Sequence, residues 1–271
     1  KENAGLTPKQ KLVLQILVAG VFILVLFLGS SGLPQLWIPF TGISFSWPWP
    51  LYIVFAAFVI VGADNAVNLT DGIDGLAASV TLPVAIFFVF VGFRRGDMGV
   101  VIFSAALAGA LLGFLRYNFN PAKVFMGDTG SMFLGYVLSV LAVMGVAKSV
   151  TFISLVTPIL VLGIPIFDTL FAIVRRTIKH QPLFKPDKEH LHHCLLNMGF
   201  SHRNTVLVIY GINIVLAASG LLISYVTTTQ AMILLVIIST AVLIGARKLG
   251  IIGLKTPAVN NKNIPSDTNK K

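Results

Sequence analysis

Residues that could do chemistry concentrate in three short segments. The first, residues 68–75, reads NLTDGIDG. It places the carboxylates of Asp71 and Asp74 and the amide of Asn68 in one short loop, where two glycines let the backbone approach a ligand closely. Asp74 is also placed to cap a helix that begins at Leu76. Because two carboxylates, an amide and two glycines exceed what a helix cap requires, this segment favours a binding site for a sugar, a nucleoside or a metal ion.

The second segment, residues 118–131, reads NFNPAKVFMGDTGS. Its single carboxylate, Asp128, has a glycine within two residues on either side and lies near Lys123 and Phe125. One interpretation makes Asp128 the cap of a helix that begins at Met132. The other makes it a ligand for Mg2+, which prefers oxygen ligands and takes one or two carboxylates together with substrate phosphates. The residues alone leave both interpretations open.

The third segment, residues 175–203, is the one long charged loop, and it holds a cluster of cations and histidines. These are Arg175, Arg176, His190, His192, His193 and Arg203. Zinc is one alternative, but a helical zinc pair needs separations such as i and i+4, and no second group of ligands is evident. A solvated basic loop is another alternative. We favour an anion-binding loop in which histidine and arginine side chains contact a diphosphate.

The composition requires a membrane around these segments. Apolar residues make up 56% of the 271 positions and charged residues 11%, against roughly a quarter charged in an average soluble domain. The apolar residues fall into blocks whose lengths suit a bilayer, and the shortest block can continue to Asn68. We predict eight membrane-spanning helices, at residues 12–28, 51–63, 76–93, 99–115, 132–147, 152–174, 205–225 and 231–246. The fold class is therefore an all-α polytopic membrane protein, with residues 1–253 as one transmembrane catalytic domain.

The positive charges orient the predicted spans. Alternating eight spans across the membrane collects all but three of the twenty Lys and Arg residues on one side, and loops rich in positive charge stay in the cytoplasm. The exceptions are Arg94, Arg95 and Lys148. The three chemical segments then face the cytoplasm. The net charge of +10 needs no nucleic acid partner, because it meets anionic lipid head groups and phosphorylated substrates.

Other features lie between the spans, after them or inside them. On the exterior side, residues 36–49 read LWIPFTGISFSWPW, which predicts a short β-hairpin around a glycine turn. Residues 254–271 are polar and rich in lysine, so we expect a disordered basic cytoplasmic tail. Asp64 and Asp168 lie inside apolar spans, where a charge is costly unless it is paired, solvated or bound to a cation. Asp168 is near enough to Arg175 along a helix to brace the histidine loop.

Three stretches together resemble one known family. They read NLTDGIDGLAAS at residues 68–79, NPAKVFMGDTGSMFLGY at residues 120–136, and PIFDTLFAIVRR followed by DKEHLHH up to His193. Their order is similar to that of the polyprenyl-phosphate N-acetylhexosamine-1-phosphate transferase family, of glycosyltransferase family 4 type, over most of the chain. The letters HLHH and PIFDT with the paired arginines resemble the branch that uses UDP-N-acetylglucosamine. That branch includes the enzymes that initiate wall teichoic acid and enterobacterial common antigen.

The resemblance implies an activity and roles for the candidate residues. The activity is Mg2+-dependent transfer of N-acetylglucosamine-1-phosphate from a UDP-sugar to undecaprenyl phosphate, with release of UMP, in a bacterial cytoplasmic membrane. Mn2+ is an alternative cofactor, and a homodimer stays open. The resemblance assigns Mg2+ to Asp128, and catalysis to Asp128, Asp71, Asp74 and His192. It assigns substrate binding to Asn68, Phe125, Lys123, His190, His193, Arg175 and Arg176, with Phe125 near the uracil and the histidines on the diphosphate.

Other interpretations stay open. The branch that transfers phospho-N-acetylmuramoyl-pentapeptide is the main alternative, because the letters GLTPKQK resemble it. The family has three spans before the position of Lys1, which would give eleven in the full-length protein, and a paired-aspartate motif there that residues 1–11 lack. A membrane transporter would place its site near the midplane and show internal repeats, and neither is evident. A structural scaffold would not need three charged loops on one side.

Overall fold

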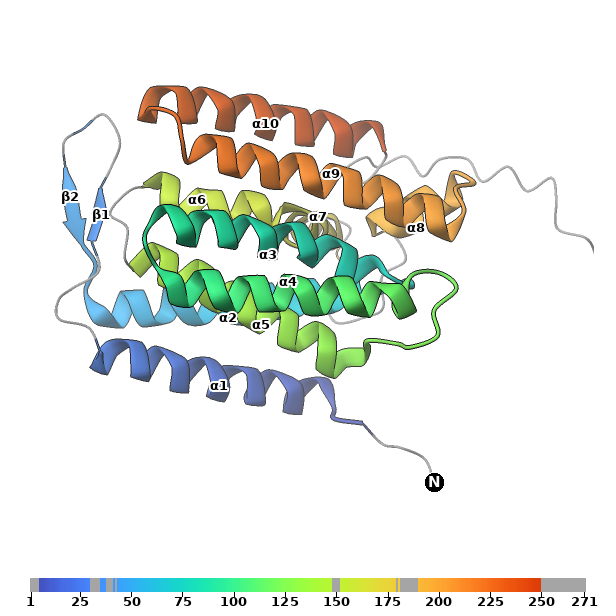
Figure 1. The fold of residues 1–271 in the computed structure, drawn as a ribbon, viewed down its shortest axis with the longest axis horizontal. Helices are drawn as coiled ribbons and strands as arrows, with labels where there is room; N and C mark the ends of the chain where they lie inside the picture. Colours follow the sequence, from blue (N-terminus) through green and yellow to red (C-terminus); the bar gives the residue numbers. More distant parts are fainter. Residues whose placement is uncertain are drawn as a thin grey trace, which may run out of the picture.

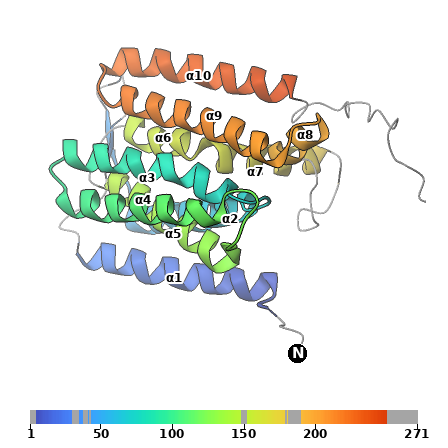
Figure 2. The same ribbon diagram turned by 45° about the vertical axis from the view of Figure 1, so that its right-hand side comes forward.

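The computed structural model describes residues 5–29, 35–37, 41, 43–147, 152–178, 180 and 190–249. Over these residues the chain forms a helical bundle with one small pair of strands (Figures 1 and 2). In chain order the elements are α1 (Pro8–Leu28), β1 (Gln35–Trp37), β2 (Ser44–Ser46), α2 (Trp49–Thr70), α3 (Leu76–Arg94), α4 (Met98–Asn118), α5 (Gly127–Ala147), α6 (Phe152–Val161), α7 (Gly163–Ile178), α8 (Leu191–Asn197), α9 (His202–Ile223) and α10 (Thr228–Lys248). The predicted tail at residues 254–271 and the letters DKE of the histidine loop lie outside the described residues.

Seven of the helices in the described part of the chain are long and apolar enough to cross a membrane, namely α1 to α5, α9 and α10. Each overlaps one of the predicted spans. Helix α3 is the most buried of the seven and packs against α4 and α9. Ala77, Ala78 and Ala85 are buried along it, and such small side chains let neighbouring helices approach closely within a membrane.

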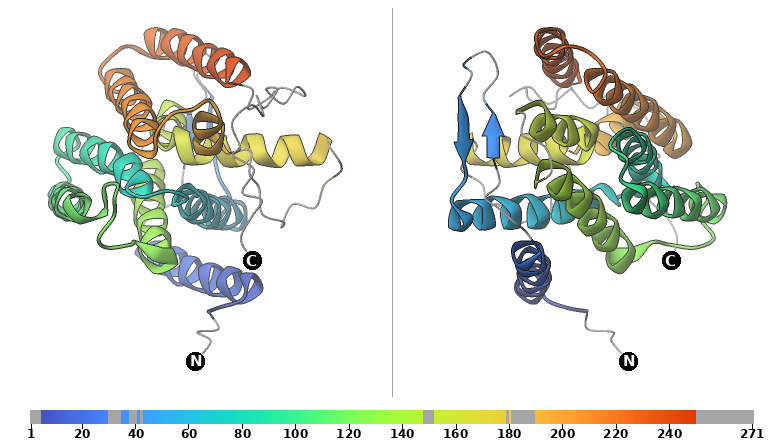
Figure 3. Two further views of the ribbon diagram at one scale, coloured as in Figure 1. Left: turned by 90° about the vertical axis from the view of Figure 1, so that its right-hand side faces the viewer. Right: turned by 60° about the vertical axis from the view of Figure 1, so that its left-hand side comes forward.

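The predicted span at residues 152–174 was wrong as a single helix. The chain forms α6, turns at Leu162 and continues as α7, which runs across the direction of the long helices and is seen end-on in Figure 1 and from the side in Figure 3. Pro165 explains the break, because its nitrogen has no hydrogen to bond the carbonyl four residues earlier, and Gly163 adds backbone freedom. The predicted crossing at residues 152–174 is therefore replaced by two shorter helices.

Helices α2 and α5 pack closely, and this contact positions much of the candidate site. The predicted span at residues 51–63 extends to Thr70, and the added end is buried at Ala66, Val67 and Thr70. Gly135 of α5 lies directly against α2, because a Cβ atom there would be 2.6 Å from the Cα atom of Asp64. The polar ends of α2 and α5 are thereby held side by side.

The two strands lie between α1 and α2 in the sequence. β1 and β2 pair antiparallel, with Leu36 opposite Phe45 and Trp37 opposite Ser44. Figure 1 places them at the end of the bundle away from the amino terminus. That this end faces the exterior remains a prediction.

Candidate active site

The three chemical segments meet at one end of the bundle. The first joins α2 to α3, the second joins α4 to α5, and the described part of the third includes α8, just before α9 (Figures 1 and 2). Long antiparallel helices bring alternate connections to the same end, so segments far apart in sequence become neighbours. The contacts of Asp128, Asp74 and His192 show how they fit together.

The side chain of Asp128 receives contacts from two other helices. It lies in the first turn of α5, and its side chain is 59% exposed. The Asn68 amide of α2 donates to Asp128 Oδ1 at 3.3 Å and to Ser131 Oγ at 2.8 Å. The Lys11 ammonium of α1 forms an ion pair with Asp128 Oδ2. Because α5 begins at Gly127, a helix that begins at Met132 and is capped by Asp128 is excluded.

Asp74 fastens the first segment to the second. Its Oδ2 accepts hydrogen bonds from the Asn120 amide at 3.1 Å and from the backbone N–H of Ala122 at 3.0 Å. It does not cap α3, because the N-cap position is taken by Gly75 with a φ of 81°, a left-handed conformation that glycine adopts readily. Asp74 therefore serves to hold the two loops together.

Asp71 lies near both other carboxylates of the site. Burial, together with the negative charges of Asp128 and Asp74, raises the pKa of the Asp71 carboxyl to about 6. Two carboxylates that oppose the ionisation of Asp71 form an electrostatic environment that attracts a cation. Oxygen ligands of this kind suit Mg2+.

The histidine motif packs onto the first segment. His192 is 3% exposed, and a Cβ atom at Gly72 would lie 2.5 Å from His192 Nε2, so residue 72 has no room for a side chain. The His192 Nε2 atom has no hydrogen-bond partner among the described residues. Burial lowers the pKa of His192 to about 4, and the neighbouring His193 contributes to this shift as the second-largest cause. His192 is therefore neutral near pH 7, and its unpartnered ring nitrogen lies against Gly72, the residue after Asp71.

Asp168 braces the histidine motif, as its position in the sequence predicted. It lies on α7, and its Oδ2 is 3.0 Å from His190 Nδ1, while its Oδ1 accepts from the backbone N–H of Leu191 at 2.8 Å. The rings of His190 and His192 stand parallel, with centroids 6.0 Å apart. The break between α6 and α7 thus supplies the carboxylate that orients α8. Within the described residues, no set of three His, Cys, Asp or Glu side chains could hold a metal ion, so zinc has no support there.

Other candidate residues are less closely joined to this centre. Arg175 and Arg176 are buried in the last turn of α7. Lys123 and Phe125 are exposed on the loop before α5, and Phe125 is 73% exposed. Contact of these four side chains with a substrate remains a prediction. Arg203 Nε donates to the Asn120 carbonyl at 3.0 Å and so ties α9 to the second segment. Its contact with a diphosphate also remains a prediction.

Lys11 was missed as a site residue. Its charge counted only toward orientation, although a lysine in the first helical turns after a proline is a detectable signal of a cation at a membrane face. Only packing reveals its partner, since Lys11 and Asp128 are 117 positions apart.

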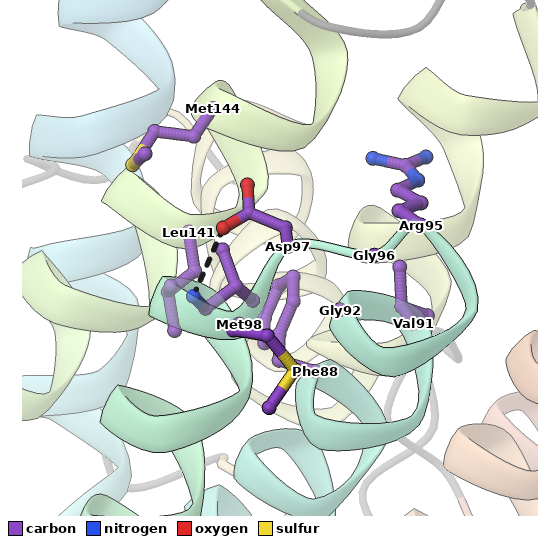
Figure 4. A pocket seen from close by; sticks show the side chains of 10 residues that line it. Phe88, Val91, Gly92, Arg95, Gly96, Asp97, Met98, Leu141 and Met144 are labelled. Carbon is purple, nitrogen blue, oxygen red and sulfur yellow. Dashed lines mark hydrogen bonds between the residues drawn. The ribbon is translucent and has the colours of Figure 1, made fainter.

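A cavity lies at the other end of the bundle, at the turn between α3 and α4 (Figure 4). It measures about 550 Å3 and is lined by residues that include Phe88, Arg95 and Met144. Asp97 lies at its edge and caps α4 by accepting from the backbone N–H of Val100 at 3.2 Å. None of the three chemical segments contributes to this cavity.

Known proteins place the chain in a family. Residues 3–146 match the model of glycosyl transferase family 4. A probable undecaprenyl-phosphate N-acetylglucosaminyl 1-phosphate transferase of Bacillus subtilis (strain 168) is 40% identical over 252 residues, which are 92% of this chain and 68% of the relative. Phospho-N-acetylmuramoyl-pentapeptide-transferases of Moorella thermoacetica and Clostridium beijerinckii are 42% and 38% identical, over 80% and 81% of this chain and 66% and 65% of the relatives.

The chain thus spans about two thirds of the length of these relatives. Both kinds of relative are named as transferases of phosphorylated sugars, and the family model covers the first two chemical segments. The apolar helices agree with a multi-pass membrane protein. The chain therefore belongs to glycosyl transferase family 4, a family of transferase enzymes.

Proposed function

We propose that the full-length protein transfers N-acetylglucosamine-1-phosphate from UDP-N-acetylglucosamine to undecaprenyl phosphate and releases UMP. The observation that carries this proposal is the convergence of Asn68, Asp71, Asp128 and the unused nitrogen of His192 at one end of the bundle. Among the relatives, the glucosaminyl transferase matches over 252 residues and the first pentapeptide transferase over 226. The longer match supports the glucosaminyl reaction.

The reaction joins two anions, and that repulsion is its main barrier. A phosphate oxygen of the lipid attacks the phosphorus that carries the sugar, a new P–O bond forms, and the bond to the UMP oxygen breaks. In phosphoryl transfer, positioning and charge stabilisation contribute more than covalent chemistry from the protein. In this proposal Lys11 and the neutral His192 contact phosphate oxygens. The pairing of Lys11 with Asp128 and the packing of His192 on Gly72 support this role.

The residues at this end fit Mg2+. Asp128 is the exposed carboxylate at the start of α5, and Asp71 is close enough for their charges to oppose each other. Mg2+ uses one or two carboxylates and takes its other ligands from water and phosphate, which agrees with so small a set of protein ligands. Asp128 would hold the ion, with Asp71 nearby, and the ion would supply positive charge to the diphosphate.

The pentapeptide reaction is the second candidate, favoured by the 42% identity of the Moorella relative. Purified full-length protein in vesicles with undecaprenyl phosphate and Mg2+ should exchange labelled UMP into UDP-N-acetylglucosamine. Assayed side by side, UDP-N-acetylmuramoyl-pentapeptide should give no exchange. Preference for the pentapeptide donor would assign the protein to the pentapeptide branch. Exchange with neither donor would refute the proposed activity.

A further inference from the structure

Asp64 is a buried carboxylate of α2 that the proposed reaction does not use. The residue is 4% exposed, and its Oδ1 atom has no hydrogen-bond partner among the described residues. A carboxylate at this depth is costly unless it is paired with a cation or another donor. Asp64 lies four residues before Asn68, which places it one helical turn deeper than the Asn68 contact with Asp128.

A cavity of about 500 Å3 between α1, α2 and α5 is lined by both Asp64 and Asp128. Lys11 also lines it and pairs with Asp128. One turn further along α1, the buried Gln15 accepts from the Asn65 amide at 2.9 Å and hydrogen-bonds the Asp64 side chain. Lys11 and Gln15 are separated by about 6 Å along the helix, a length that the flexible stem of a lysine covers. The Lys11 ammonium thus has a second carboxylate within range.

A divalent cation on Asp128 would compete with Lys11 for the same carboxylate. Two cations on one carboxylate repel each other strongly at the edge of a membrane, where the dielectric constant is low. Binding of the ion therefore requires the ammonium to leave Asp128. The unpartnered Oδ1 of Asp64 provides a destination inside the same cavity.

We propose that Asp64 is a positioning residue that receives the Lys11 ammonium when a divalent cation occupies Asp128. Asp64 thereby raises the affinity of the site for the cation, and it keeps Lys11 next to the phosphate groups of the substrates. This assignment rests on the proposed function, because it takes Asp128 as the ligand of the cation. It adds a role for a side chain outside the three chemical segments.

The test measures Mn2+ binding to the full-length protein in lipid nanodiscs without substrates. Electron paramagnetic resonance detects the bound ion. Asp64→Asn keeps the size of a side chain that packs at the α2–α5 contact, and it should weaken Mn2+ binding by about tenfold, as expected for one charged contact. Lys11→Met removes the competing ammonium and should tighten binding. In the Lys11→Met background, Asp64→Asn should have no further effect.

An equal loss of Mn2+ affinity in both backgrounds would overturn the assignment, because Asp64 would then act independently of Lys11. If Asp64→Asn does not fold, as judged by its melting temperature, Lys11→Met alone decides: unchanged Mn2+ affinity would mean that the lysine does not compete with the ion. Asp128→Asn separates the two levels of inference. Mn2+ binding unaffected by this change would refute the metal assignment itself, and with it the proposed function.

Discussion

Asp128 is the residue on which the candidate site is centred. Lys11 and Asn68 contact its two oxygens from α1 and α2, and Ser131 shares the Asn68 amide. A residue whose only role was to start a helix would not need side-chain contacts from two other helices. The geometry thus favours binding of a cation over capping, which were the two interpretations that the residues alone left open.

Asp128→Asn should abolish transfer and its response to Mg2+, because it removes one charge without changing the volume of the side chain. Membrane insertion should be unchanged. Asp97→Asn is the matched control, since Asp97 is a helix-capping carboxylate at the other end of the bundle and should retain wild-type turnover. UMP exchange by the two variants in vesicles compares them. A rate above about a tenth of wild type for Asp128→Asn, a barrier change below about 1.4 kcal/mol, would reduce Asp128 to a structural residue.

At the scale of elements, the contact between α2 and α5 sets the distance between Asn68 and Asp128. The backbones of Gly135 and Asp64 lie in contact, so the two helices approach more closely than they could with a side chain at position 135. One turn toward the site, Asn68 bonds Ser131, which repeats the same helix pairing with polar atoms. Gly135, the last glycine of the motif MGDTGSMFLGY, therefore supports the site through helix packing and not through contact with a ligand.

Gly135→Ala should force α5 away from α2 and lower the stability of the protein. Overpacking of this kind costs about 1–3 kcal/mol, so the melting temperature in detergent should fall, and UMP exchange should fall with it as Asn68 moves from Asp128. Gly109→Ala in α4 is the control, because no atom lies within 4 Å of the Cβ position there. Equal melting temperatures for the two variants would contradict the close contact.

At the scale of the whole molecule, the distribution of charge predicts which end of the bundle faces the cytoplasm. Cysteine labelling in intact bacterial cells measures this directly. In a Cys194→Ser background, Gly99→Cys at the start of α4 should react with a membrane-impermeant maleimide from outside. His202→Cys at the start of α9 should react only after the cells are permeabilised. The reverse pattern would invert the predicted topology and place the candidate site outside the cell.

Several properties followed from the sequence by itself. Its low charge and long apolar blocks require a membrane, and these depend on local composition, so seven of the predicted spans overlap membrane-spanning helices. The three chemical segments were found because glycines, carboxylates and histidines are conspicuous among apolar residues. Their placement at one end also followed, since alternate connections of antiparallel helices share an end.

Tertiary structure decided the rest, because the deciding contacts join residues far apart in the chain. Apolar periodicity does not show where a buried helix breaks, so the turn at Leu162 appeared only in the fold. Local spacing suggested that Asp74 caps α3, whereas packing of the α4–α5 loop gives it Asn120 as a partner instead. The pairing of Lys11 with Asp128 has no signal in either segment, since it depends on how α1 packs against α2 and α5.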